Sequence, residues 1–174
     1  MKTNETELRL IDLNLDTNDE NTRVSGYVNL TNQWSQKLGT RKKFVERIVP
    51  GTFTKALQNG NEITFLAEHD NSKVLATTRN GSLVLREDDK GLWMEATINN
   101  TSWGKDYHEL IKDGTIQNMS FGMQVVKDDW KKVKDDLYER PVSDIILKEV
   151  SAVRFPAYVQ STIAARSTEV IEDV

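Results

Sequence analysis

Short runs in which apolar and polar residues alternate recur along the chain, and each predicts a β-strand whose side chains point alternately to two faces. The strongest pair of runs, 82–87 and 92–98, flanks the turn-forming segment 88–91. Two alternating runs on either side of a glycine-containing turn predict a β-hairpin. Further strands are predicted at 8–10, 23–30, 44–49, 63–67, 115–126, 137–139 and 145–153.

An apolar stripe indicates the clearest helix. Its members, spaced at i, i+4, i+7 and i+8, are Trp103, Tyr107, Leu110 and Ile111. Thr101 or Ser102 can cap the helix start, and Gly114 stands where a left-handed residue commonly ends a helix. The pattern therefore predicts a helix over 102–113.

A shorter helix is predicted over 52–58, with Asn59-Gly60 ending it. The stretch 128–136 is charged around Trp130 and is expected to be an exposed loop or the tip of a hairpin. Many short strands with one or two helices predict an α+β fold that is mainly β. We expect a closed or nearly closed antiparallel β-barrel surrounded by helices.

Composition narrows the class of protein. With 174 residues, one domain is expected over residues 1–166, followed by a flexible C-terminal tail at 167–174. The chain has no cysteine and a net charge of −4, which excludes disulfides and thiolate chemistry and disfavours a nucleic-acid binder. The polar N-terminus and the lack of a long apolar run predict an intracellular, soluble protein with no membrane contact.

Ser120 is the first residue with candidate chemistry. It lies between Met119 and Phe121 in a predicted strand, so the serine points to the face opposite these two apolar side chains. A serine hydroxyl becomes a useful nucleophile only when an adjacent base takes its proton. The surrounding residues do not form the G-x-S-x-G turn of the α/β-hydrolases.

The general base must come from two histidines, since the chain has only His69 and His108. His69 follows a predicted buried strand, where a side chain is held rigidly and can be directed into a cleft. His108 flanks the apolar stripe of the predicted helix near Lys105 and Lys112, so we expect an exposed surface residue there. Either histidine could also be purely structural.

A base of this kind needs a third group to hold its tautomer and to stabilise its charged form, and a carboxylate can do both. Asp70 is adjacent to His69, but neighbouring residues of a strand point to opposite faces, so a turn with Asn71 is the expected role of Asp70. Glu149, in a predicted strand, is the other candidate. No second histidine stands at a spacing suited to zinc, so we expect neither a metal nor another cofactor.

Five segments together resemble the prohead proteases of tailed bacteriophages with the HK97-type capsid. They are 46–53 (ERIVPGTF), 68–70 (EHD), 87–92 (EDDKGL), 119–123 (MSFGM) and 147–153 (LKEVSAV) followed by 156–158 (PAY). They stand in the family's order and cover roughly residues 23–166. The resemblance implies a serine endopeptidase with a fold similar to the herpesvirus maturation protease.

Carried onto this chain, the resemblance implies that Ser120 is the nucleophile, His69 the general base and then acid, and Glu149 the orienting carboxylate. The oxyanion hole is expected near 154–157 (RFPA). The implied substrates are scaffold protein or the scaffolding segment of the major capsid protein, and the protease itself, within the phage procapsid in the host cell cytoplasm. Self-association as a dimer or larger assembly is also implied.

Two other functions compete with this hypothesis. A catalytically silent module that binds scaffold or capsid protein during assembly would need none of Ser120, His69 and Glu149. A serine hydrolase of small esters is disfavoured because the chain has no G-x-S-x-G turn and no HGGG-type oxyanion loop.

Overall fold

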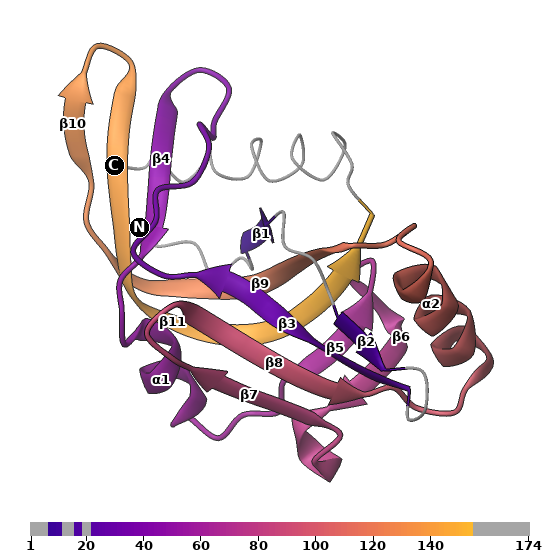
Figure 1. The fold of residues 1–174 in the computed structure, drawn as a ribbon. Helices are drawn as coiled ribbons and strands as arrows, with labels where there is room; N and C mark the ends of the chain where they lie inside the picture. Colours follow the sequence, from indigo (N-terminus) through magenta and orange to yellow (C-terminus); the bar gives the residue numbers. More distant parts are fainter. Residues whose placement is uncertain (1–6, 12–15, 19–21, 155–174) are drawn as a thin grey trace.

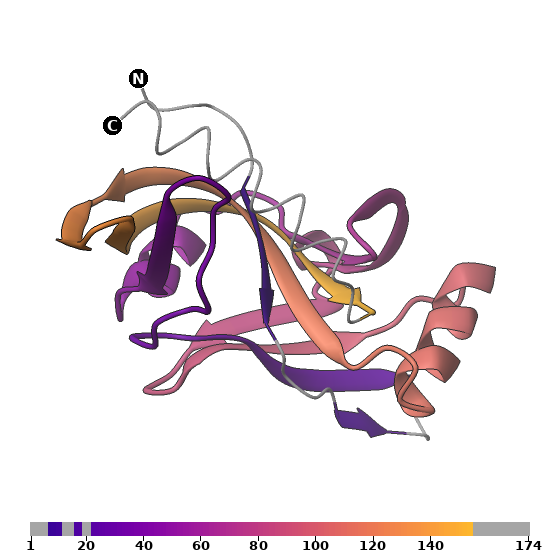
Figure 2. The same ribbon diagram turned by 90° about the horizontal axis from the view of Figure 1, so that it is seen from above.

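The computed structural model describes residues 7–11, 16–18 and 22–154. Its strands form two sheets (Figures 1 and 2). The strands are β1 (Glu7–Ile11), β2 (Asp16–Asn18), β3 (Arg23–Leu30), β4 (Lys43–Ile48), β5 (Thr64–Ala67), β6 (Asp70–Thr77), β7 (Leu83–Glu87), β8 (Gly91–Thr97), β9 (Asn118–Asp128), β10 (Lys131–Lys134) and β11 (Leu137–Val153). The helices are α1 (Thr52–Leu57), the 3₁₀ turn η1 (Thr78–Asn80) and α2 (Ser102–Lys112).

The larger sheet follows the order β1-β9-β11-β5-β6, with β4 and β10 also pairing with β11. The smaller sheet has the order β2-β3-β8-β7 and contains the predicted hairpin of β7 and β8. Most predicted strands are confirmed. Strand β6 was not predicted, and its first residues, Asp70 to Lys73, are polar. The hairpin expected around Trp130 contains the short strand β10.

Strand β11 is the longest element and organises the larger sheet. It pairs antiparallel with β9 and β10 and parallel with β4 and β5. The prediction of separate strands at 137–139 and 145–153 is wrong, since one strand runs through residues 140–144 between them. Arg140 within that stretch is buried and ion-paired, and Pro141 occupies a register position opposite Arg47 of β4.

The mainly β composition is confirmed, whereas a closed barrel is not. Among the described residues the strand pairings give two sheets and no closed ring. The N-terminal segment contributes β1 to one sheet and β2 to the other. The two parallel pairings of β11 also correct the expectation of a wholly antiparallel arrangement.

Apolar side chains from both sheets and both helices form one main core. Helix α2 packs on β6, where Trp103 Nε1 donates to the Val74 carbonyl at 3.0 Å. Its predicted cap and end are confirmed: Thr101 accepts from the amide of Gly104, and Gly114 has a φ of +81°. The predicted short helix is confirmed as α1.

A second, smaller apolar cluster contains Leu38 and Phe44, with Trp130 and Tyr138 packed against them. It lies in what we call the arm: β4, β10, residues 137–142 of β11 and the loop 32–42. The arm projects from the main body at the upper left of Figure 1. The predicted tail at 167–174 lies outside the described residues, and a single domain over 1–166 stays a prediction.

Candidate active site

Three adjacent elements of the larger sheet carry the predicted site residues. Ser120 is on β9, Glu149 is on β11, and His69 lies in the turn that joins β5 to β6. Because β11 pairs with β9 on one side and with β5 on the other, it brings these elements together. The structure thus brings together all three residues, which stand 80 positions apart at most in the sequence.

The pleat of β9 separates the site from the main core. Met119 and Phe121 belong to the main core, so Ser120 points to the opposite face, as the alternation predicted. Ser151 of β11 stands opposite Ser120, and Glu149 stands opposite Gly122. Since directly opposite residues of antiparallel strands share a face, these side chains lie on the serine face of the sheet.

His69 is held by a tight turn with an unusual backbone. Glu68 and His69 have φ values of +53° and +58°, and the flanking residues Ala67 and Asp70 pair with each other. Two consecutive positive φ values are the pattern of a type I′ hairpin turn, where asparagine and glycine are preferred. Each non-glycine residue in this region costs about 1–2 kcal/mol, and such strain is characteristic of functional sites.

Two hydrogen bonds fasten this turn to the end of β11. The amide of Glu68 donates to the Ala152 carbonyl at 2.9 Å, and the amide of Arg154 donates to Glu68 Oε1 at 2.8 Å. The neighbour of His69 therefore bonds to the same strand that carries Glu149. The sequence reasoning missed this role of Glu68, because a charged residue in a turn gives no signal of its own.

The site forms one continuous line of hydrogen bonds. Ser120 Oγ lies 2.9 Å from His69 Nε2, and His69 Nδ1 lies 2.5 Å from Glu149 Oε1. The other carboxylate oxygen, Glu149 Oε2, accepts from Ser151 Oγ at 2.5 Å. Ser120, Glu149 and Ser151 are all buried. With Nδ1–H donating to the carboxylate, Nε2 remains as the acceptor for the serine proton.

The other candidates are placed differently. Asp70 accepts hydrogen bonds from the hydroxyl of Ser72 at 2.6 Å and from its amide at 2.9 Å. These bonds lower the pKa of Asp70, and they are the local turn contacts expected of it.

His108 corrects the sequence-based expectation. It was expected to be exposed, but it is buried, and its Nε2 has no hydrogen-bond partner. The buried surface of α2 is wider than the predicted stripe: it also includes Gly104, so His108 faces the protein rather than water.

The expected oxyanion segment at 154–157 lies outside the described residues except for Arg154. The amide of Arg154 is already bonded to Glu68, so it does not supply a free donor. Across 7–11, 16–18 and 22–154, no cluster of three or more His, Cys, Asp or Glu residues could hold a metal ion. Within the same residues, no helix is long and apolar enough to span a membrane.

Comparison with known proteins shows which family this chain resembles in sequence. The model of a family described as the caudovirus prohead serine protease matches residues 9–173. The prohead protease of Enterobacteria phage HK97 is 30% identical over 129 residues, which are 73% of this chain and 56% of that protein. The chain therefore spans little more than half the length of this curated relative.

A solved structure, the bacteriophage T4 capsid assembly protease, is similar with a TM-score of 0.59. The likeness covers 87% of this chain and 100% of that chain, at 10% sequence identity. At this level of identity it shows a shared fold and nothing about the site.

Proposed function

Since the chain belongs to the caudovirus prohead serine protease family, whose model matches residues 9–173, we propose that it is a serine endopeptidase of capsid maturation. Its substrates are the scaffold protein or the scaffolding segment of the major capsid protein, and the protease itself. It acts inside the phage procapsid in the host cell cytoplasm. The disfavoured alternative, a hydrolase of small esters, is not needed to explain any feature of the site.

The observation that carries this proposal is the line of contacts from Ser120 through His69 to Glu149, at 2.9 and 2.5 Å. His69 Nε2 takes the hydroxyl proton as Ser120 Oγ attacks the carbonyl carbon of the scissile peptide bond. The imidazolium then gives that proton to the leaving amine, and an acyl-enzyme remains. Glu149 holds the Nδ1–H tautomer and stabilises the charge on the ring while it is protonated.

The acyl-enzyme is released by the same base in a second step. His69 removes a proton from water, the hydroxide attacks the ester carbonyl, and Ser120 Oγ leaves with the proton returned by His69. The chain order His, Ser, Glu differs from that of the common protease folds, but a triad is defined by geometry and not by order.

The burial of Ser120 bears on the competing hypothesis. Ser120 is buried in this structure, and a protease must admit a peptide to it. A silent assembly module would never need to open the site, whereas a protease must. The two hypotheses therefore differ in whether the partner is cut.

The first experiment co-expresses the chain with the capsid or scaffold protein of the same phage, as wild type and as Ser120→Ala. We expect the partner to be shortened by the wild type alone, with a loss of the order of 10⁶-fold in the variant. His69→Ala and Glu149→Ala should also lower the rate of cleavage strongly, to a residual level. Cleavage by Ser120→Ala would refute the nucleophile, and an intact partner with soluble wild-type protein would favour the silent module.

A further inference from the structure

We propose that Ser151 is a positioning residue of this site, whose hydroxyl keeps the Glu149 carboxylate ionised and directed at His69. This inference rests on the proposed function and deepens it, since Ser151 acts through Glu149 and touches no substrate. Ser151 stands two residues after Glu149 and therefore on the same face of the strand.

The two oxygens of Glu149 have separate partners, and this division carries the argument. Oε1 contacts His69 Nδ1 at 2.5 Å, and Oε2 accepts from Ser151 Oγ at 2.5 Å. Rotation of the carboxylate about its last bond would break both contacts at once. Ser151 therefore determines which oxygen faces the ring and in which plane.

The backbone on both sides of Ser151 makes it a rigid support. It stands opposite Ser120 of β9 and opposite Leu66 of β5, so β11 is hydrogen-bonded on both edges at this point. The register between β11 and β9 shifts between Leu147 and Glu149. A bulge there redirects the side chain that follows it, and Ser151 then fixes the redirected carboxylate.

The charge of the site gives the hydroxyl a second effect. Glu149 is buried, and an ionised carboxylate in such a place depends on hydrogen-bond donors to replace lost water. A donor to the charged form favours that form. Without Ser151, Glu149 would lose the donor that shares its negative charge, and His69 would face more of that charge.

The alternative is a purely structural role for Ser151. In that case the hydrogen bond between the buried side chains of Ser151 and Glu149 only satisfies their polar atoms. That alternative predicts a change in stability for Ser151→Ala but no change in the titration of His69. The positioning role predicts both. The protonation behaviour of the ring is therefore the measurement that separates them.

The first test is an NMR titration of the imidazole signals in wild type, Ser151→Ala and Ser151→Thr. The chain has two histidines, so the signals of His108 are the internal control. We expect the midpoint of His69 to move to higher pH in the alanine variant and to return toward the wild-type value in the threonine variant. An unchanged His69 midpoint in a folded Ser151→Ala protein overturns the inference, with or without activity.

The second test measures kcat and KM against pH with a peptide that spans the cleavage site. Loss of a hydrogen bond to a charged group predicts a fall in kcat/KM of about 10- to 100-fold, mostly in kcat. The acidic limb of the profile should move to higher pH. In a Glu149→Ala background, adding Ser151→Ala should change kcat/KM no further, because the serine acts only through the carboxylate.

The outcomes separate this inference from the proposed function. Loss of Ser120-dependent cleavage in the wild type would overturn the protease itself. An active wild type with Ser151→Ala equal to it, or with effects of the two substitutions that simply add, would overturn only the role of Ser151. If the Ser151→Ala protein fails to fold, Ser151→Thr provides the test instead. This variant keeps the hydroxyl, so the titration midpoint of His69 and the cleavage activity must both stay close to those of the wild type.

Discussion

Glu149, at one end of the line of hydrogen bonds, determines how His69 and Ser120 donate and accept along it. An ionised carboxylate only accepts hydrogen bonds, so Glu149 requires that His69 Nδ1 carry a proton. Neutral His69 then has a lone pair at Nε2, and the Ser120 hydroxyl must donate to it. Replacing Glu149 by glutamine would offer an amide donor as well, and the tautomer would no longer be determined.

His108 provides a sharp prediction at the residue scale. It is buried with an unpartnered Nε2, and a buried polar atom without a partner costs about 1–3 kcal/mol. We therefore expect His108→Leu, which replaces the imidazole by an apolar side chain of similar bulk, to leave stability unchanged or raise it. Cleavage of the partner should remain at the wild-type rate.

The matched control is His108→Ala, which removes the same nitrogen but leaves a cavity. It should lower the free energy of unfolding measured in urea by about 1–3 kcal/mol through lost packing, again with normal cleavage. If His108→Leu abolished cleavage in a folded protein, His108 and not His69 would be the stronger candidate for the base.

At the scale of elements, the turn between β5 and β6 is the part of the site that secondary structure alone does not hold. Its two central residues have positive φ values, and Glu68 links it to Arg154. Three substitutions at Glu68 separate the bond from the strain. Alanine removes the acceptor, glutamine keeps an oxygen there, and glycine removes the acceptor but relaxes the backbone.

We expect Glu68→Ala to lose about 1 kcal/mol of stability through the missing hydrogen bond and to cleave the partner more slowly, because His69 is held less firmly. Glu68→Gln should stay close to wild type. Glu68→Gly should be more stable than Glu68→Ala by about 1 kcal/mol, since glycine accepts a positive φ without steric cost. Thermal unfolding and gel-based cleavage rates measure these differences, and equal values for alanine and glutamine would refute the role of the bond.

The elements of the fold differ in how far the sequence alone predicts them. The hairpin of β7 and β8 and the capped helix α2 follow from local periodicity, which is complete within each segment. The positions of Ser120, His69 and Glu149 relative to one another depend on pairings between distant strands, and the family resemblance supplied that grouping. The turn at Glu68, the support from Ser151 and the burial of His108 depend on tertiary contacts that leave no periodic pattern in the chain.

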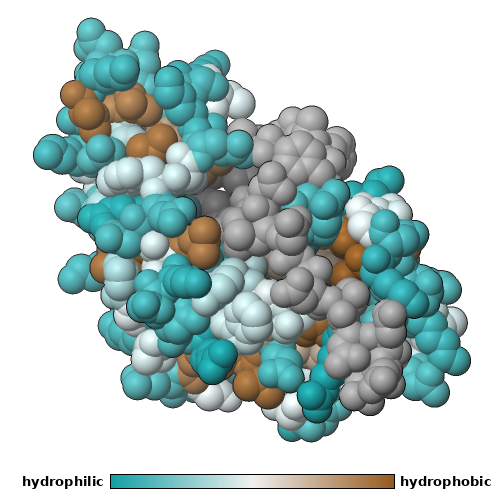
Figure 3. Space-filling view, in the orientation of Figure 1, coloured by the Kyte–Doolittle hydropathy of each residue, from teal (hydrophilic) through white to brown (hydrophobic). Residues whose placement is uncertain are grey.

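At the scale of the whole molecule, the arm is built separately from the main body. Its small apolar cluster contains Phe44 and Trp130 and does not join the main core. In Figure 3, apolar side chains gather on the arm at the upper left, and Val133 of β10 is among the exposed large apolar residues. The site, by contrast, lies on the turn between β5 and β6, on β9 and on the second half of β11.

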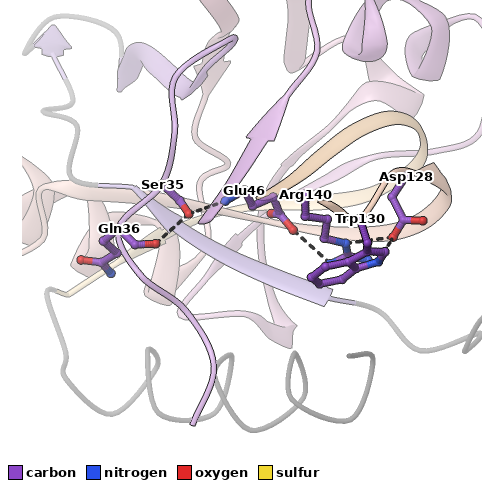
Figure 4. A network of polar contacts seen from close by, with 6 residues as sticks. All are labelled: Ser35, Gln36, Glu46, Asp128, Trp130 and Arg140. Carbon is purple, nitrogen blue, oxygen red and sulfur yellow. Dashed lines mark hydrogen bonds and ion pairs between the residues drawn. The ribbon is translucent and has the colours of Figure 1, made fainter. Parts of the chain in front are cut away.

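A buried ionic network holds the arm together (Figure 4). Arg140 is 1% exposed and donates from Nη1 to Glu46 at 3.0 Å and from Nε to Asp128 at 2.9 Å. Its guanidinium also lies 4.9 Å from the ring centroid of Trp130, and Trp130 Nε1 donates to Asp128. One side chain thus compensates two carboxylates and stacks on the aromatic ring.

The arm therefore gives a prediction about how the molecule unfolds. Arg140→Ala would leave two carboxylates without their main counter-charge, and breaking a buried ion pair in this way costs about 3–5 kcal/mol. Since the apolar cluster of the arm is small, we expect this loss to open the arm before the main body. Hydrogen exchange should become fast in 43–48 and 131–142, while amides of β9 and β11 around Ser120 and Ser151 stay protected.

Lys132→Ala is the matched control, because it removes an exposed positive charge from the same arm and should change stability by less than about 0.5 kcal/mol. With the arm open and the site intact, Arg140→Ala should still cleave a short peptide in a Ser120-dependent way. Equal loss of protection in the arm and around Ser151 would instead mean that the continuous strand β11 couples the two regions. In that case the arm would be a structural requirement of the site and not a separate unit.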